Sequence, residues 1–252
     1  MKKLLPILAF LLFAIAASAT PDEQKARFQQ ANKAYENGDY EQAAELYDAI
    51  VADGYDSWEL RYNLGNTHYR LDNIGPSILN YERALRMAPG KKVVKDNLAL
   101  ARSHTTDNIE QLPGLFLKEW ATAVANAMPL RGWLTLTLTL ALLCFASVSI
   151  FLIAKEYRIR KTIFIVGIAL LAITLLSTLN AAISVHNATK DNEAIIMSPL
   201  VVVKGSPDAK SVDKFVLHEG TKVTIGDIQD NWWQIEIADG KNGWIDGGAE
   251  RI

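Results

Sequence analysis

The sequence predicts a multidomain protein: an all-α domain of repeated helix pairs, a two-helix transmembrane hairpin and a C-terminal all-β domain. Three observations predict this fold class. Residues recur at a spacing of 34 positions between 24 and 91, two long uncharged runs lie between 133 and 185, and short β-type runs follow residue 192. With 252 residues and a net charge of −2, the chain lacks the basic field typical of nucleic-acid-binding proteins.

The N-terminal segment, residues 1–19, has the pattern of an export signal. Two lysines precede the apolar run Leu4–Ala16, and the small residues Ala17–Ala19 suit a signal peptidase that cleaves before Thr20. An uncleaved anchor helix is the alternative. Both interpretations place the chain after Thr20 on the outer side of the membrane.

The helical repeats are predicted within residues 20–111. The residue pairs 34 positions apart are Ala31 and Gly65, Asn32 and Asn66, Tyr35 and Tyr69, Tyr47 and Tyr81, and Ile50 and Ala84. This period is that of the tetratricopeptide repeat. We assign the repeats to 24–57 and 58–91 and a capping helix to 92–104. Because about three repeats are normally needed for a stable array, help from a partner or from a homo-oligomer is expected.

Small residues and a turn support the repeat assignment. Ala31 and Gly65 would let the helices of each pair approach closely, and Gly38 follows the first helix where a turn must fall. Repeats of this type bind peptide segments in a concave groove that is formed by the first helix of each pair. The candidate groove residues are therefore Phe28, Asn32, Tyr35, Tyr62, Asn66, Tyr69 and Arg70.

The groove candidates suggest a mode of binding. Asn side chains hold the backbone of an extended peptide, and Arg70 is suited to an acidic group. The alternative is that some of the tyrosines only pack between helices.

Two apolar runs predict membrane helices. Residues 133–154 begin with alternating Leu and Thr, a strand-like pattern, but the run continues without a charge, Gly or Pro. As a helix it would be about 33 Å long, enough for a bilayer core of about 30 Å, and each Thr hydroxyl can bond a carbonyl one turn back. Residues 162–185 predict a second span. The loop 155–161 (KEYRIRK) carries four basic residues and one acid, which places it in the cytoplasm.

Residues 112–131 form a predicted linker with a short helix on the outer membrane surface. Phe116, Trp120 and Val124 share an apolar face, and Trp120 and Trp133 are expected at the level of the lipid headgroups. A helix buried within the protein is the alternative.

Residues 192–252 resemble a bacterial SH3 domain, a small barrel. The resemblance rests on the Leu-x-x-Gly turn at 217–220, the Trp-Trp strand, and Asp-Gly followed by Gly-Trp-Ile. Alternation along the strand places Trp232 outside, as the main candidate for ligand contact, with Trp244 as a second one. The core face is predicted to hold Trp233, Ile235 and Ile237. Such domains bind peptides or cell-wall peptides, or serve as spacers.

The sequence gives no sign of an enzyme or of a cofactor. The protease, nucleotide-binding and hydrolase motifs are absent from it, the four His residues lie in separate segments, and Cys144 is the only cysteine. We therefore expect neither catalysis nor a bound metal or cofactor.

The order of signal segment, two tetratricopeptide repeats, membrane hairpin and SH3-like domain resembles the BatE family of the Bacteroides aerotolerance (Bat) operons. The resemblance implies a two-pass protein of a bacterial inner membrane with both large domains in the periplasm. It further implies membrane partners with von Willebrand A domains, an indirect link to a MoxR-type ATPase, and a role in aerotolerance or envelope stress.

Two functional interpretations follow. In the first, the protein is a scaffold that holds partner proteins of a membrane complex. In the second, it is an envelope sensor or regulator whose SH3-like domain binds peptidoglycan. The cytoplasmic loop of 155–161 is short for signalling through this chain alone, which favours the scaffold.

Overall fold

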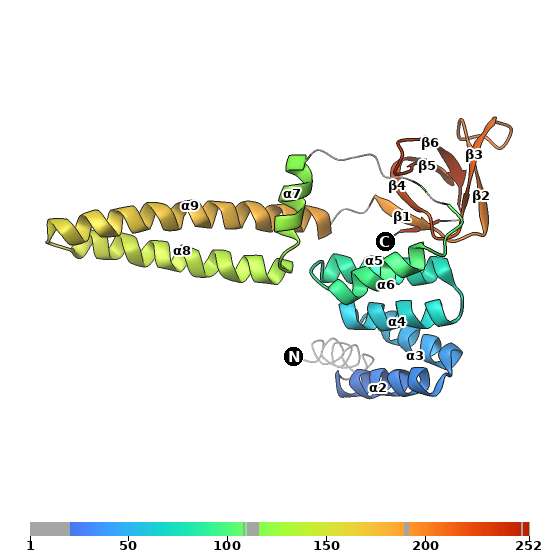
Figure 1. Ribbon diagram of the computed structural model, residues 1–252, viewed down its shortest axis with the longest axis horizontal. Coiled ribbons are helices and arrows are strands. Elements are labelled where there is room, and N and C mark those ends of the chain that lie inside the picture. Colours follow the sequence, from blue (N-terminus) through green and yellow to red (C-terminus); the bar gives the residue numbers. More distant parts are fainter. Residues whose placement is uncertain (1–20, 108, 110–115, 189–191, 248, 252) are drawn as a thin grey trace, which may run out of the picture.

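A computed structural model describes residues 21–107, 109, 116–188, 192–247 and 249–251. The predicted signal segment 1–19 lies outside these residues. The described chain forms a stack of helices, a long helical hairpin and a β-domain (Figure 1). The predicted fold class is thereby confirmed.

The N-terminal stack contains two helix pairs and a further helix. The helices are α2 (Pro21–Asn37), α3 (Tyr40–Ala52), α4 (Trp58–Arg70), α5 (Ile74–Met87) and α6 (Lys92–Arg102). Gly38 has φ +88°, a conformation that glycine adopts without strain, and it turns the chain between α2 and α3. The Ser57 side chain begins α4 by accepting a hydrogen bond from the Leu60 N–H at 3.1 Å.

The helices of the second pair approach closely at Gly65. A Cβ atom at this position would lie 2.7 Å from two ring carbons of Tyr81, which is itself only 1% exposed. The Ser77 hydroxyl donates to the Gly65 carbonyl at 2.9 Å. In the first pair Ala31 is fully buried. The small residues therefore do let the paired helices touch, as their spacing predicts.

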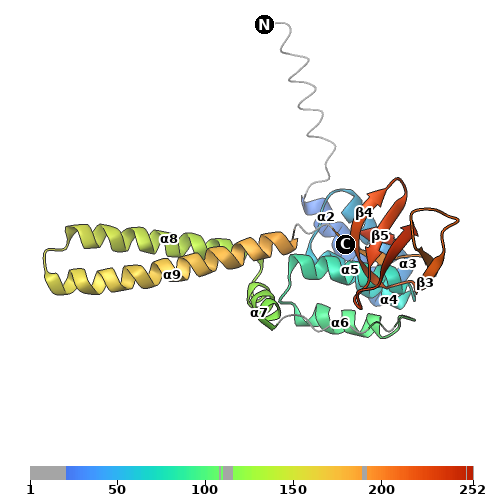
Figure 2. The same cartoon turned by 90° about the horizontal axis from the view of Figure 1, so that it is seen from above.

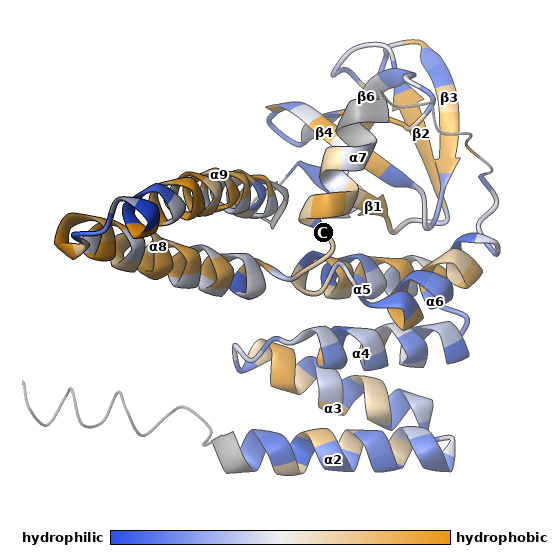
Figure 3. Ribbon diagram, turned by 60° about the vertical axis from the view of Figure 1, so that its left-hand side comes forward, coloured by the Kyte–Doolittle hydropathy of each residue, from blue (hydrophilic) through white to orange (hydrophobic). Residues whose placement is uncertain are grey.

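Two long antiparallel helices form an arm that projects from the rest of the molecule (Figures 1 and 2). They are α8 (Leu130–Ile153) and α9 (Tyr157–Ala188). Both are long and apolar enough to cross a membrane. Their residues are predominantly hydrophobic (Figure 3), and many of the large apolar side chains are exposed.

The connection between α8 and α9 is shorter than the sequence predicts. The predicted loop was 155–161, but α9 already begins at Tyr157, so the basic residues from Arg158 to Lys161 lie on its first turns. Arg and Lys are good helix formers, so the helical backbone can continue from the apolar sequence into the charged sequence without a break. The prediction was wrong in its boundary.

The Leu–Thr alternation in α8 places its hydroxyls as expected of a helix. Thr135 and Thr139 donate to the carbonyls of Arg131 and Thr135 one turn back, at 3.0 and 2.8 Å. Thr137 points the other way and pairs with the hydroxyl of Ser177 on α9 at 2.7 Å. These three threonine hydroxyls are thus hydrogen-bonded within the hairpin.

The short helix α7 (Phe116–Ala125) precedes the hairpin and contacts α9. Trp120 on α7 is 61% exposed, in keeping with a surface position. Trp133 is not at the surface: it is 8% exposed, and its Nε1 donates to the Ala125 carbonyl at 2.8 Å. The Trp133 ring therefore fastens α8 to the end of α7.

The C-terminal part is a seven-stranded antiparallel sheet with the strand order β3-β2-β6-β5-β4-β1-β7. Its strands are β1 (Glu193–Ile196), β2 (Leu200–Lys204), β3 (Asp213–His218), β4 (Lys222–Gln229), β5 (Trp232–Glu236), β6 (Asn242–Asp246) and β7 (Ala249–Arg251). Ile235 and Ile237 are buried in the core and Trp233 packs against it, on the face that the alternation predicts. Residues from β1 to β6 share this core, which requires the sheet to curl.

The β-domain packs on the last helices of the stack. Ile195 of β1 is fully buried in the cluster that contains Ile78 of α5 and Val94 of α6. Beside it the buried carboxylate of Glu82 pairs with Arg102 of α6 and, at 3.2 Å, with Lys222 of β4. An apolar centre with paired charges beside it is typical of stable interfaces between protein domains.

A second set of contacts joins the loop after α6 to the turn between β3 and β4. The carboxylate of Asp107 accepts three hydrogen bonds of 2.7 Å, from the backbone N–H of His218, its ring Nδ1 and the hydroxyl of Thr221. Glu219 accepts from the Gly75 N–H at 2.8 Å. The β-domain thus covers the last helices of the short array within the same chain.

Candidate peptide-binding groove

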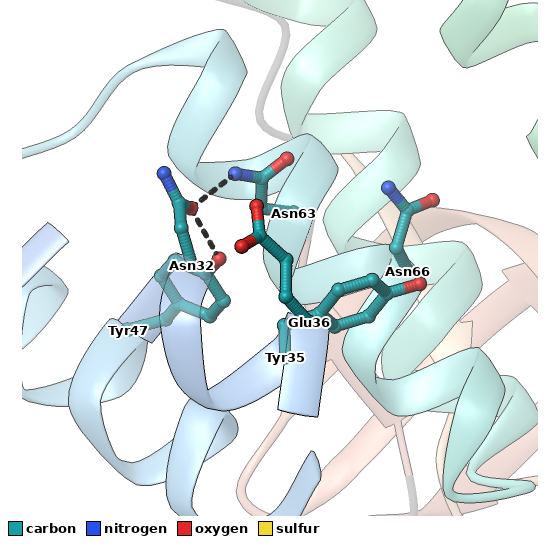
Figure 4. Close-up of a pocket in the computed structure, with 6 residues that line it drawn as sticks. All are labelled: Asn32, Tyr35, Glu36, Tyr47, Asn63 and Asn66. Carbon is teal, nitrogen blue, oxygen red and sulfur yellow. Dashed lines mark hydrogen bonds between the residues drawn. The ribbon is translucent and has the colours of Figure 1, made fainter. Parts of the chain in front are cut away.

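Helices α2, α3 and α4 line an open cavity of about 340 Å³. Figure 4 shows the residues that line it: Asn32, Tyr35, Glu36, Tyr47, Asn63 and Asn66. Three of them, Asn32, Tyr35 and Asn66, are groove residues that the sequence predicts.

A hydrogen-bonded triad fixes Asn32 at the edge of this groove. The Tyr47 hydroxyl donates to Asn32 Oδ1 at 2.6 Å, and the Asn63 Nδ2 donates to the same oxygen at 3.0 Å (Figure 4). The three side chains come from α2, α3 and α4, so the triad joins one repeat to the next.

The same triad recurs 34 residues later. The Tyr81 hydroxyl donates to Asn66 Oδ1 at 2.7 Å, and the Asn97 Nδ2 donates to that oxygen at 2.8 Å. Here the capping helix α6 supplies the third member. The repeat period therefore reproduces a constellation of side chains in addition to a helix pattern.

In each triad the Nδ2 group of the first asparagine, Asn32 or Asn66, takes no part in the internal hydrogen bonds. In Asn32 and Asn66 the carbonyl oxygen accepts both internal bonds. Within the described part of the chain, neither Nδ2 has an acceptor. An asparagine held by its oxygen presents its N–H donors in a fixed direction, which suits the carbonyl oxygens of an extended peptide.

Burial keeps the tyrosines of the triads protonated. Desolvation raises the pKa of Tyr47 to about 12, although the amide of Asn63 acts in the opposite sense. Burial also raises the pKa of Tyr81. Both hydroxyls are therefore donors throughout the neutral range, and the Asn oxygens remain the acceptors.

The other predicted groove residues have mixed roles. Arg70 is exposed, and a hydrogen bond with Tyr35 raises the pKa of its guanidinium. Phe28 packs against the Tyr47 ring at 5.8 Å, Tyr62 packs in the core and accepts from Asn97 at 3.2 Å, and Tyr69 meets His104 edge-on at 5.5 Å. These three half-buried aromatic residues thus pack within the stack.

Sequence reasoning missed part of the site. Tyr47 and Tyr81 were recognised only as repeat positions, while Glu36, Asn63 and Asn97 were not singled out. The signal for the amides was present: Asn63 and Asn97 are also 34 residues apart.

The two tryptophan candidates of the β-domain differ in exposure. Trp232 is half-buried and stands opposite Asp246 of β6. Trp244 is only 9% exposed, in the middle of β6 between β2 and β5. Trp244 is therefore a poor candidate for ligand contact, because its buried ring offers little surface to a ligand.

His68, on helix α4 of the repeats, leads to a prediction about the pH dependence of stability. Burial lowers the pKa of His68 despite the attraction of Asp48, and its Nδ1 is a buried atom without a hydrogen-bond partner. The unfolded chain therefore protonates this imidazole at a higher pH than the folded chain does. The contribution of neutral His68 to the free energy of unfolding is complete above about pH 6.5, and below that pH it falls by at most about 1.4 kcal/mol per pH unit.

Urea unfolding of the detergent-solubilised protein at pH 7.5 and 5.5, followed by circular dichroism, checks this prediction. A His68→Leu variant is expected to lose the difference, whereas a variant of the exposed His104, His104→Gln, is expected to keep it. An equal pH effect in wild type and His68→Leu would refute the assignment.

Comparison with known proteins supports the assignment of the N-terminal helices as tetratricopeptide repeats. A family model described as Tetratricopeptide repeat matches residues 28–92, which include every triad residue except Asn97. No curated protein matches the chain. The repeat region is therefore of a type that binds other proteins.

Proposed function

We propose that this chain is a non-enzymatic scaffold of a membrane complex that holds an extended segment of a partner protein in its repeat groove. The observation that carries the proposal is the duplicated triad. Two asparagines at equivalent places in consecutive repeats offer N–H donors to a segment that runs along the stack, so the binding would depend on main-chain carbonyls. Arg70 would add an acidic preference at one end.

The proposal also assigns the groove to a membrane surface. In the proposal α8 and α9 cross the inner membrane of a bacterium, with the basic start of α9 in the cytoplasm and both soluble parts in the periplasm. The partner would then be another protein of the envelope. By resemblance the candidates are membrane proteins with von Willebrand A domains and, through them, a MoxR-type ATPase that serves aerotolerance or envelope stress.

The proposal gives the β-domain a structural role. We take it as an SH3-like module whose main task is to complete the repeat array, because β1 and the β3–β4 turn are committed to α5, α6 and the loop after α6. Binding of peptidoglycan through Trp232 is the alternative function, favoured by the half-exposed position of this ring on the outer face.

Asn32→Asp/Asn66→Asp is the substitution that tests the groove. An aspartate keeps the oxygen that accepts from Tyr47 and Tyr81, but it replaces the outward N–H donor with an acceptor. We expect the double variant to fold and to lose at least about 90% of partner capture, because two donors are lost at once. Capture is measured in cells, with a photo-crosslinking amino acid in place of the exposed Glu36.

The controls separate charge from position. Asn37→Asp/Asn231→Asp adds the same two charges at exposed positions that do not line the groove and is expected to keep the crosslink. A crosslinker in place of the exposed Asp246, which is paired with Trp232, reports on the alternative. Protein adducts at Glu36 that survive Asn32→Asp/Asn66→Asp would contradict the groove, and wall fragments at Asp246 without protein adducts at Glu36 would favour the peptidoglycan function.

A further inference from the structure

A second cavity, of about 300 Å³, lies between the two helices of the hairpin. It is lined by Cys144, Ser147, Val148, Phe151, Ile163, Phe164, Gly167, Ile168 and Leu171. We call it the hairpin pocket. These residues belong to the last turns of α8 and to the first half of α9, so the pocket lies towards the end of the arm that points away from the other domains (Figure 1).

The two helices approach each other closely at the floor of the hairpin pocket. A Cβ atom on Gly167 would lie 3.0 Å from Ser147 Oγ, and the Ser147 hydroxyl donates to the Ile163 carbonyl at 3.2 Å. At the end near the α8–α9 turn, the rings of Phe151 and Phe164 lie with their centroids 6.1 Å apart. Because the Ser147 hydroxyl already has an acceptor, the pocket offers a mainly apolar surface to an occupant.

Arg160 stands at the turn end of the same stripe of α9. It precedes Phe164 by four residues, and Gly167 and Leu171 follow at spacings of three and four, so these positions share one face of the helix. The guanidinium of Arg160 lies 4.9 Å from the centroid of the Phe151 ring, which lines the pocket from α8. This cation–π contact holds a positive charge at the end of the hairpin pocket.

The surrounding charges are predominantly positive. Residues 155–161 carry four basic side chains and one acidic side chain, and all of them are exposed. Within the described part of the chain, Arg160 has no acidic partner. The start of α9 therefore offers a cation at the point where the apolar surface begins.

The length of this surface matches one leaflet of a bilayer. From Arg160 to Leu171 the helix rises about 16 Å, and half of a bilayer core of about 30 Å is about 15 Å. In the proposed topology Arg160 is at the cytoplasmic surface, and the pocket runs from there into the hydrocarbon. A phosphate at Arg160 would then be joined to an acyl chain in the pocket.

Charge and shape together favour one class of occupant. The planar fork of a guanidinium fits two phosphate oxygens, and basic pockets between membrane helices on the cytoplasmic side bind the headgroups of anionic lipids. A free inorganic ion would leave the apolar pocket unfilled. The cationic group of a zwitterionic headgroup would be repelled by the neighbouring basic residues.

We propose that the hairpin pocket binds an anionic phospholipid, with one acyl chain between α8 and α9 and the phosphate on Arg160. Such a lipid would fill the space between the diverging side chains and stabilise the paired helices. The inference rests on the membrane crossing of the proposed function, but it does not depend on a peptide in the groove.

Native mass spectrometry of the full-length protein, released from a neutral detergent, tests the headgroup. The probes are a phosphatidylglycerol and a phosphatidylcholine with the same acyl chains, and inorganic phosphate as a competitor. We expect the protein to retain phosphatidylglycerol at least about tenfold more strongly than phosphatidylcholine. Arg160→Gln should abolish this preference. Arg158→Gln removes the same charge about 200° away around the helix and should keep most of it.

A second pair of variants tests the apolar part of the site. Val148 lines the pocket and is 56% exposed, so Val148→Trp should fill the pocket without disturbing the contact between the helices and should reduce retained phosphatidylglycerol at least about tenfold. Leu175→Trp, at a position that is exposed but does not line the pocket, is the matched control and should have no effect.

Each contrary result overturns a defined part of the proposal. Equal losses in Arg160→Gln and Arg158→Gln, or a wild type without preference, would reduce the effect to a general attraction and overturn the site. Unchanged retention in Val148→Trp would exclude the pocket, and displacement of phosphatidylglycerol by an equal concentration of inorganic phosphate would exclude the lipid as the source of the phosphate. Release of the chain from membranes by carbonate would instead contradict the membrane crossing itself.

Discussion

Asp107→Ala is expected to release the β-domain from the helix stack. The change removes the acceptor of three hydrogen bonds at once and leaves the backbone N–H of His218 and the hydroxyl of Thr221, which is 6% exposed, without a partner. Each unsatisfied buried donor costs about 1–3 kcal/mol, so the docking of the two parts should weaken by about 2–5 kcal/mol.

The character of the Asp107 carboxylate supports a large effect. Burial works against its ionised form, yet hydrogen bonds from Thr221 and from the backbone and ring of His218 hold the pKa of Asp107 below its ordinary value. The charged form is therefore the one that the interface stabilises.

Hydrogen exchange measured by mass spectrometry is the suitable readout. In Asp107→Ala, faster exchange is expected at Gly75, whose N–H bonds to Glu219, and at Ile196, whose N–H bonds to the Thr221 carbonyl. The first repeat should be unchanged. Asp96→Ala, which breaks an exposed pair with Lys92, serves as the control. Unaltered exchange at Gly75 and Ile196 would show that Asp107 does not hold the domains together.

Gly65→Ala is expected to destabilise the repeats although alanine is the better helix former. An ordinary glycine-to-alanine change within a helix gains about 1 kcal/mol. Here the new Cβ would overlap the ring of Tyr81, which is enclosed by the core and cannot withdraw. Overpacking of this kind costs about 1–3 kcal/mol net. Because the Tyr81 hydroxyl holds Asn66, the change should also disturb the groove.

The free energy of unfolding in urea decides this prediction, and the first repeat supplies the matched control. Ala31 occupies the equivalent place and is fully buried. Ala31→Gly is expected to cost about 1 kcal/mol through the backbone alone. A Gly65→Ala variant more stable than wild type would mean that the two helices have room to separate.

The elements that the sequence predicted well are those with a local period. Residues 34 positions apart located the helix pairs and two of the groove asparagines, and uninterrupted apolar composition located α8 and α9. The partners that orient Asn32 and Asn66 were missed because Asn63 and Asn97 belong to the following helix. Their own spacing of 34 residues marks them as equivalent repeat positions, but it does not show that each one contacts the asparagine of the preceding helix pair.

The contacts between the parts could not be predicted in this way. Asp107 and His218 are separated by 111 residues, with the whole hairpin between them. Alternation in β5 placed Trp233 and Ile235 correctly, but it gave no information on how many strands cover Trp244. Burial by distant strands, like the docking of β1 on α5, is decided by tertiary packing.

The insertion of the hairpin between two parts that contact each other has a consequence for biosynthesis. The ribosome delivers the helix stack first, with the surface that receives Ile195 still open to solvent. If α8 and α9 cross the membrane, β1 reaches that surface only after both have been threaded and the chain has returned to the original side. A failed second crossing would strand β1 in the wrong compartment and leave the stack uncovered. Closure of this interface would thus act as a proofreading step, distinguishing a correctly inserted chain from a misinserted one that proteases can remove.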